Sequence, residues 1–272
     1  MSSEVRQVVL LTARSLEQRW RSLLAWSVGV VLIAVLQLAV YPSVSRSAQS
    51  LDELLQSYPE GLREAFGLQD YGTGPGYLHA ELFSLVVPLV LLAVAVATGA
   101  AATAAEEERG TADLLLALPL RRAVMLAGKA SALLASVIIV AGVVAVTLLV
   151  GVGLVELDVA TSHVLAATAG AALLSLPFGA AALALGALTG RRAVAIGIPL
   201  ALAMSAFLVE ALGPLADWLR PWQNVSPFHW AFAGRPLENG LDLGGAALLL
   251  GVTVAVGAAA VVVFGRRDVR TT

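Results

Sequence analysis

The order of apolar and polar residues divides the chain into six long apolar stretches separated by shorter polar segments. A helix that crosses the hydrocarbon core of a membrane needs about 20 mostly apolar residues. Six stretches meet this requirement, at about residues 23–41, 82–102, 125–155, 164–188, 193–209 and 244–264. They are continuously apolar and lack the alternation of barrel strands. The pattern therefore predicts an all-α integral membrane protein with six transmembrane helices.

Three of the stretches need a separate comment. The third is too long for one upright helix and too short for two, so its start is expected to lie along the interface, with Lys129 reaching the headgroups. The fifth is short because Glu210 closes it, although Ala211 and Leu212 extend the apolar run past that charge. The first is longer than the apolar region of a signal peptide and has no small-x-small cleavage site after it, so it is expected to remain as an anchor.

Basic residues divide unevenly between the two sides of the predicted bundle. With six spans both termini share a side, and that side holds thirteen of the seventeen Lys and Arg residues. The four on the opposite side are Arg46, Arg63, Arg220 and Arg235. The positive-inside rule therefore places residues 1–22, residues 103–124 and both termini in the cytoplasm. Charged residues make up only 13% of the chain, against about 25% in an average soluble domain.

The first 22 residues have an imperfect amphipathic pattern. One helical face carries Val5, Val9, Thr12, Leu16 and Trp20. This pattern predicts an interfacial helix that lies on the inner leaflet. The alternative is an ordinary charged segment before the first span.

Two longer segments are predicted to be external loops, at residues 42–81 and 210–242. In the first loop, a capping-box pattern from Ser50 to Glu53 and a helix-starting Pro59 predict two short helices. The run YGTGPG is expected to break the structure before the second span. The second loop contains the large aromatic residues Trp218, Trp222, Phe228, Trp230 and Phe232. An aromatic belt at the headgroups is the simpler interpretation, and a substrate-stacking site is the alternative.

The sequence contains no enzyme constellation. The motifs H-E-x-x-H and G-x-S-x-G are absent, and there is no Cys to act as a nucleophile or metal ligand. All three histidines fall on the outer side, opposite Glu106–Glu108, and the arginine of the CAAX-processing peptidases is replaced by Thr111 or Ala112. Residues 123–130 are a near miss for a phosphate loop, since alanines replace its first glycine and its Ser/Thr. No catalytic, cofactor-binding or metal-binding residue is predicted, and no cofactor.

Polar side chains near the middle of the predicted spans are few and uncharged, and they include Gln37, Thr98, Thr147 and Ser175. A charge at the bilayer centre costs about 2.5–3.5 kcal/mol, so the charge relays of proton-driven or sodium-driven carriers stand out in a sequence. The predicted spans show no such relay. The energy for any transport is therefore expected to come from another subunit.

The densest charge cluster lies in the predicted cytoplasmic segment 103–124. Three glutamates are followed by Gly110, which breaks the helix, and by Thr111, a suitable N-cap for a short leucine helix that Pro119 ends. Anionic lipids would repel the glutamates, so a protein surface is the expected partner of this segment.

The segment EEERGTADLLLALPLRRAVMLAGK resembles the first cytoplasmic loop of the permease subunits of ATP-binding-cassette exporters of the type-2 exporter class. Those loops typically read Glu, Gly-Thr, a leucine run, Pro, Arg and Gly-Lys. The external NVSPFHWAFAGRPLENGLD and the terminal FGRRDV are also similar to bacterial members. With the six spans, the resemblance covers nearly the whole chain, residues 1–272, as a single six-helix transmembrane permease domain.

The resemblance implies that the cytoplasmic loop holds a coupling helix that docks on a separate cytosolic ATPase. The coupling residues would be Glu106, Glu107, Glu108, Gly110, Thr111, Leu114, Leu115, Leu116, Pro119, Arg121 and Arg122. A pair of permeases, as two copies or two paralogues, would work with a pair of ATPase subunits in the bacterial plasma (inner) membrane. Membrane lipids are the remaining partner, and no nucleic acid is expected.

The cargo expected from the sparsely charged spans is hydrophobic or amphiphilic: a drug, as in multidrug resistance, a lipid or a peptide-like compound. The resemblance also implies that the chain is not itself an enzyme, because ATP would be hydrolysed on the separate subunit. An autonomous secondary carrier or channel without an ATPase is the alternative interpretation.

Overall fold

The computed structural model describes residues 3–47, 54, 57–65, 68, 70–108 and 122–266. Regular structure in this part of the chain is entirely helical, and six of its helical segments are long and apolar enough to cross a membrane. The six long helices are α1 (Ser3–Arg46), α5 (Val86–Glu108), α7 (Arg122–Leu154), α8 (Thr161–Thr189), α9 (Arg192–Leu212) and α13 (Leu243–Arg266). The prediction of an all-α protein with six spans is confirmed.

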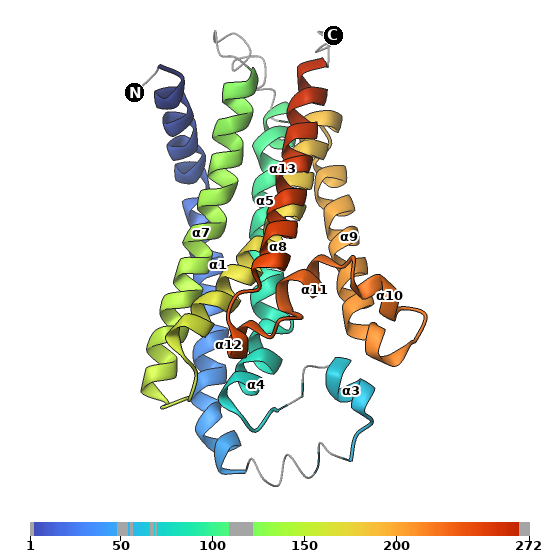
Figure 1. Ribbon diagram of the computed structural model, residues 1–272. Coiled ribbons are helices and arrows are strands. Elements are labelled where there is room, and N and C mark those ends of the chain that lie inside the picture. Colours follow the sequence, from blue (N-terminus) through green and yellow to red (C-terminus); the bar gives the residue numbers. More distant parts are fainter. Residues whose placement is uncertain are drawn as a thin grey trace.

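The long helices form one bundle whose two ends differ (Figure 1). One end holds both termini, the end of α5 and the start of α7, and we call it the terminal end. The opposite end, which we call the loop end, holds the short helices α3 (Glu60–Ala65), α4 (Gly74–Leu78), α10 (Arg220–Gln223), α11 (Pro227–Phe232) and α12 (Pro236–Asn239). The short helix expected after Pro59 is confirmed as α3, whereas the one expected from residue 50 lies outside the described residues.

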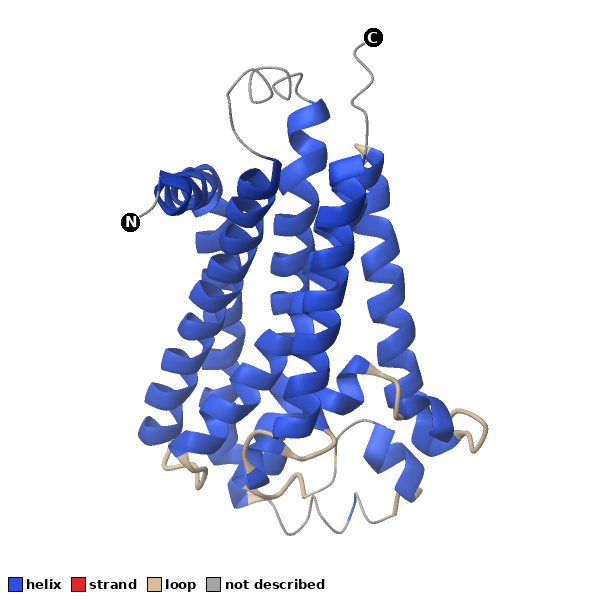
Figure 2. Ribbon diagram, turned by 45° about the horizontal axis from the view of Figure 1, so that its top comes forward, coloured by secondary structure: helices blue, strands red, loops and turns tan. Residues whose placement is uncertain are grey.

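Helix α1 joins the predicted interfacial segment and the first span without a break. Figure 2 shows its first turns end-on while the rest of the helix runs along the bundle, so the amphipathic segment turns away from the bundle axis. Its position on the inner leaflet stays a prediction. The third apolar stretch is likewise one continuous helix, α7, with Lys129 near its start.

The second span begins earlier than its apolar run. Thr73 caps α4 by accepting a hydrogen bond from the backbone N–H of Gly76 at 3.1 Å, and Pro75 lies in the first turn, where proline is tolerated. The expectation that YGTGPG breaks the structure is therefore wrong from Gly74 onward. A π-helix, η1 (His79–Phe83), follows α4 and carries the chain to α5.

The π-helix shows in a wide backbone hydrogen bond. Ser84 donates its N–H to the His79 carbonyl at 2.7 Å, a bond that spans five residues instead of four. Pro88 follows in the first turn of α5, where a missing N–H is tolerated. The candidate span runs from α4 through η1 and α5, over Gly74–Ala102, and includes Glu81.

Helix α8 is the centre of the bundle and packs against α5, α7, α9 and α13. Of its most apolar window, 72% is buried within the chain, against 17% for α9 and α13, so these last two helices leave most of their apolar surface outside the fold. Gly190, at φ +65°, ends α8 in the left-handed conformation that glycine favours.

The approach between α5 and α8 is close because glycines face it. A Cβ built on Gly99 would collide with the Gly179 carbonyl oxygen, and one built on Gly179 would lie 2.9 Å from the Ala95 Cβ. Small residues at such crossings let helix backbones approach closely in a membrane.

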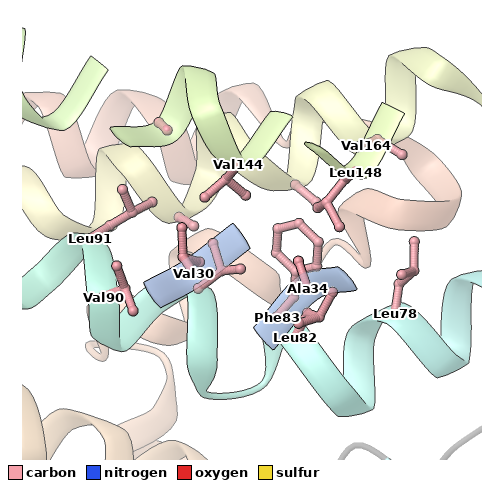
Figure 3. Close-up of a cluster of buried hydrophobic side chains, with 14 of the residues drawn as sticks. Val30, Ala34, Leu78, Leu82, Phe83, Val90, Leu91, Val144, Leu148 and Val164 are labelled. Carbon is pink, nitrogen blue, oxygen red and sulfur yellow. The ribbon is translucent and has the colours of Figure 1, made fainter. Parts of the chain in front are cut away.

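The largest buried hydrophobic cluster joins α1, the α4–η1–α5 segment, α7 and the start of α8 (Figure 3). Phe83 and Leu82 of η1 are fully buried there, beside Ala34 of α1. Further members shown are Val30, Leu78, Val90, Leu91, Val144, Leu148 and Val164. This cluster holds the π-helix in place and so determines where the polar side chains of the loop end lie.

Candidate functional site

The predicted coupling segment lies between α5 and α7 at the terminal end. α5 ends at Glu108 and α7 begins at Arg122. Gly110, Thr111, Leu114, Leu115, Leu116, Pro119 and Arg121 lie outside the described residues. Glu106, Glu107 and Glu108 belong to the last turn of α5 and Arg122 to the first residue of α7, and only their backbone is described. The coupling roles therefore stay predictions.

The first half of α1 contacts both helices that flank this segment. Thr12 donates its hydroxyl to the Gly128 carbonyl of α7 at 3.3 Å, and a Cβ on Gly128 would lie 2.8 Å from the Leu11 Cβ. Arg19 donates from Nη2 to the Ala97 carbonyl of α5 at 3.0 Å. α1 therefore links α7 near its first turns to α5 at Ala97, about three turns before α5 ends at Glu108.

A polar cluster lies at the loop end, where α1 meets η1. Glu81 accepts hydrogen bonds from the Tyr71 hydroxyl at 2.6 Å and from the Gln37 side-chain amide. Tyr77 donates its hydroxyl to the Gln37 backbone carbonyl at 2.7 Å, and its ring lies 5.1 Å from that of Tyr41. Burial, followed by the hydrogen bond to Glu81 and the charge of that carboxylate, raises the pKa of Tyr71.

This cluster corrects one expectation from the sequence. The spans were expected to hold only weakly polar groups, yet Glu81 and Glu210 fall within the candidate spans Gly74–Ala102 and Arg192–Leu215. The apolar run begins at Leu82, so the sequence pattern by itself predicts that Glu81 lies in the loop before the second span. The helical start at Thr73–Pro75 was the sequence signal that could have placed it correctly.

We expect Gln37→Leu to lower the free energy of unfolding by about 1–3 kcal/mol, because it removes one of the two donors to a half-buried carboxylate. Replacing Gln37 and Glu81 together by leucine should recover part of that loss, since no carboxylate is then left with a missing partner. Thermal unfolding of the purified variants in one detergent measures both effects. A double variant whose loss equals the sum of the two single losses would contradict a direct interaction.

The second polar feature of the loop end is a cleft of about 140 Å³ between η1, the end of α9 and α11, which we call the α9–α11 cleft. Its main lining side chains are Phe83, Phe207, Phe228, Phe232, His79 and Glu210. Glu210 Oε1 lies 3.1 Å from His229 Nδ1, and Gln223 donates to the Glu210 backbone carbonyl at 3.1 Å. α9 continues past Glu210 to Leu212, in line with the apolar run that Ala211 and Leu212 extend beyond that charge.

Four of the five large aromatic residues between residues 210 and 242 divide into two groups. Trp218 and Trp222 are 73% and 61% exposed, as expected of a belt at the headgroups. Phe228 is buried, with its ring 5.5 Å from that of Phe207, and Phe232 stacks edge-on with His79. The belt interpretation is therefore wrong for these two phenylalanines, because Ser226 caps α11 and bonds the Ala206 carbonyl, which holds α11 against α9.

An ion pair links the two long loops of the loop end. Arg235 lies 2.6 Å from Asp70 and 2.6 Å from Glu238. Arg235 and Asp70 both have positive φ, at 51° and 55°, which non-glycine residues adopt at a cost. Within the described part of the chain, no group of three or more His, Asp or Glu side chains could hold a metal ion.

Comparison with known proteins agrees with this architecture. The family model described as ABC-2 family transporter protein matches residues 11–269. The match includes both long loops of the loop end, α1 from residue 11 onward, the other five long helices and the segment between α5 and α7. No curated protein matches the chain.

Proposed function

Because the chain belongs to the ABC-2 family of transporter proteins, we propose that it is the permease of an ATP-driven exporter and that residues 103–124 couple it to a separate ATPase. Permeases of this family are membrane transport components that generally work with an ATP-binding-cassette ATPase. The observation that carries the proposal is the family match across six membrane-spanning helices, combined with the charge pattern of the segment between α5 and α7.

The terminal end faces the cytoplasm in this proposal. Thirteen of the seventeen Lys and Arg residues lie on the side that holds residues 1–22 and 103–124, and such an excess marks the cytoplasmic side. Residues 42–81 and 210–242 are then external. The ATPase would meet the leucine helix and the acidic triplet from the cytoplasmic side, and α1 bonds both of the helices that this segment connects.

A second permease, either a copy of this chain or a paralogue, completes the proposed transporter. α9 and α13 support this, since only 17% of the most apolar window of each is buried within the chain. Lipid and a second permease would share these surfaces. The proposed cargo is hydrophobic or amphiphilic, and the proposed location is the bacterial plasma (inner) membrane.

One observation favours a second candidate function, an autonomous carrier. Glu81 and Glu210 fall within candidate spans, where carboxylates are costly and often functional. Glu81, however, is bonded to Gln37 and Tyr71, which is also what a purely structural cluster requires. The ATPase-coupled exporter remains the proposal because the carrier gives no role to the acidic triplet.

The test is purification of the tagged chain from its native host in mild detergent, with mass spectrometry and an ATP hydrolysis assay on the same fraction. We expect a stoichiometric cytosolic ATPase and ATP hydrolysis sensitive to vanadate. An unrelated six-span protein purified in parallel controls for contaminants. A chain that arrives alone and without ATPase activity, at several detergent strengths, would contradict the exporter and favour the autonomous carrier.

A further inference from the structure

The α9–α11 cleft lies on the boundary between two packed halves of the loop end. Phe83, on one side, belongs to the large cluster that includes α1, α4, η1 and α7, which we call the first half. Phe228, on the other side, belongs to a cluster that includes α9, α11 and α13, the second half. We propose that α3 and Asp70 act as a strap that holds the halves together and opens the cleft when it releases. Passage of cargo through the opened cleft rests on the proposed export function, whereas the strap itself does not.

The strap reaches from the first half to the second. α3 and Asp70 belong to the loop that leaves α1 and enters α4, and both of these helices lie in the first half. α3 nevertheless packs against α9 and against η2 (Gly213–Leu215), the short helix that follows α9 (Figure 1). A Cβ built on Gly61 would lie 3.0 Å from the Pro214 carbonyl oxygen, so the two backbones touch here. Because Pro214 also lines the cleft, α3 supports one of its walls.

Asp70 anchors the other end of the strap in the first half. Its carboxylate accepts a hydrogen bond from Arg235 Nη2 at 2.6 Å, and Arg235 is the N-cap of α12, whose Leu237 is buried in the first cluster. The Asp70 carbonyl accepts hydrogen bonds from the N–H and the hydroxyl of Thr73, which caps α4. α3 ends at Ala65, five residues earlier, so the chain between them spans at most about 18 Å. While α3 stays docked, this short tether limits how far η2 can move away from the first half.

Docking of the strap is marginal, as a contact that must release requires. α3 has six residues, too few to be stable without its docking contact. Within the described residues, the buried Nε of Arg63 on α3 has no hydrogen-bond partner, which is a cost of the docked state. The Asp70 and Arg235 side chains are 56% and 44% exposed, and ion pairs with such exposure contribute little to stability. The docked and released states are therefore close in free energy.

The wall of the cleft that moves is the end of α9 with η2 and α10. Only 17% of the most apolar window of α9 is buried within the chain, and η2 and α10 pack against α9 and against each other. The opposite wall, η1, stays in place because Phe83 is fully buried in the first half. Release of α3 from η2 therefore widens the cleft, whose volume is about 140 Å³ while the strap is docked.

Thiol labelling inside the cleft measures whether the strap is docked. The chain contains no Cys, so Ser84→Cys places a single thiol at a half-buried position that lines the cleft. The full chain is placed in lipid nanodiscs without nucleotide and reacted with N-ethylmaleimide, a neutral reagent. Gly61→Leu should raise the labelling rate about fivefold, because the added side chain crowds Pro214 and Leu215 and displaces α3.

Two further sets of variants accompany this measurement. Glu60→Leu is the matched control, because it adds the same side chain at an exposed position of α3, and it should leave the labelling rate unchanged. Asp70→Asn and Arg235→Gln should each raise the rate about twofold, and the double variant should add no further increase, since both remove the same ion pair. The two substitutions change the local charge in opposite directions, so equal effects cannot come from charge alone.

Gel filtration shows which variants fold, and the Asp70 and Arg235 variants carry the test if Gly61→Leu does not. Unchanged labelling in a folded Gly61→Leu variant would overturn the proposal, as would an equal rise in Glu60→Leu. Unchanged labelling in both ion-pair variants would also overturn it, because the strap would then work without its anchor. Absence of an ATPase partner would contradict only the proposed export function, since the labelling uses no nucleotide.

Discussion

Replacing Glu107 or Glu108 by alanine is expected to uncouple transport from ATP hydrolysis while the protein still inserts in the membrane. Both residues end α5, next to the proposed docking segment. If they meet basic residues of the ATPase and lose water there, removing one partner costs about 2–5 kcal/mol. A loss of 2 kcal/mol already weakens docking by about 30-fold. Energised membrane vesicles that contain both subunits measure transport and ATPase activity together.

The control for this experiment is Glu17→Ala. Glu17 lies on α1 on the same proposed side of the membrane, is exposed, and is not part of residues 103–124. We expect it to transport as the parent protein does. Parent-like transport in both single variants and in the Glu107→Ala/Glu108→Ala double variant would exclude a coupling role for this part of the acidic cluster.

Replacing Gly99 by leucine is expected to prevent normal packing of α5 against α8. Even the first carbon of the side chain would collide with the Gly179 carbonyl oxygen, which belongs to a helix backbone and cannot rotate away. Overpacking of a core typically costs about 1–3 kcal/mol, and a backbone obstacle at the central crossing should place the cost at or above the upper end. We expect little monodisperse protein by gel filtration and a strongly lowered unfolding temperature.

Gly142→Leu is the matched control, because it adds the same side chain to a long helix of the same bundle. A Cβ on Gly142 would meet no atom within 4 Å, and the residue is exposed on α7. This variant should behave as the parent protein does. Similar losses in both variants would mean that leucine at any glycine is harmful and that the α5–α8 crossing has no special role.

The spans could be predicted from the sequence because the membrane imposes a strong and simple requirement. Continuous apolar runs of the right length must be helical in lipid, and each of the six expected runs falls on one of the six long helical segments of the structure. Their ends were less predictable. Thr73 and Pro75 start a helix inside a glycine-rich run, and α9 continues past a charged residue that lies beside His229.

The features of the loop end depend on contacts between distant segments, which a single sequence does not display. Gln37 and Glu81 are separated by 44 positions and meet only because α1 packs beside η1. From the sequence, Phe228 is indistinguishable from the other aromatic residues expected at the headgroups. It is buried only because α11 packs against α9. For the proposed coupling segment the opposite holds. The motifs and their order along the chain are visible in the sequence, whereas residues 109–121 lie outside the described structure.

The central position of α8 has a consequence for biosynthesis. α8 is the fourth long helix in chain order, so α1, α5 and α7 are made before the helix that buries most of α5. Glu81 and Gln37 can pair as soon as the second span inserts, since both partners are by then synthesised. The close contact between Gly99 and Gly179 can form only after α8 has been synthesised. Assembly in the membrane therefore has an early step, in which polar groups join the first two spans, and a late step, in which α8 closes the bundle. A nascent chain that stalls between these two steps exposes the face of α5 that carries Gly99 to lipid and to the insertion machinery.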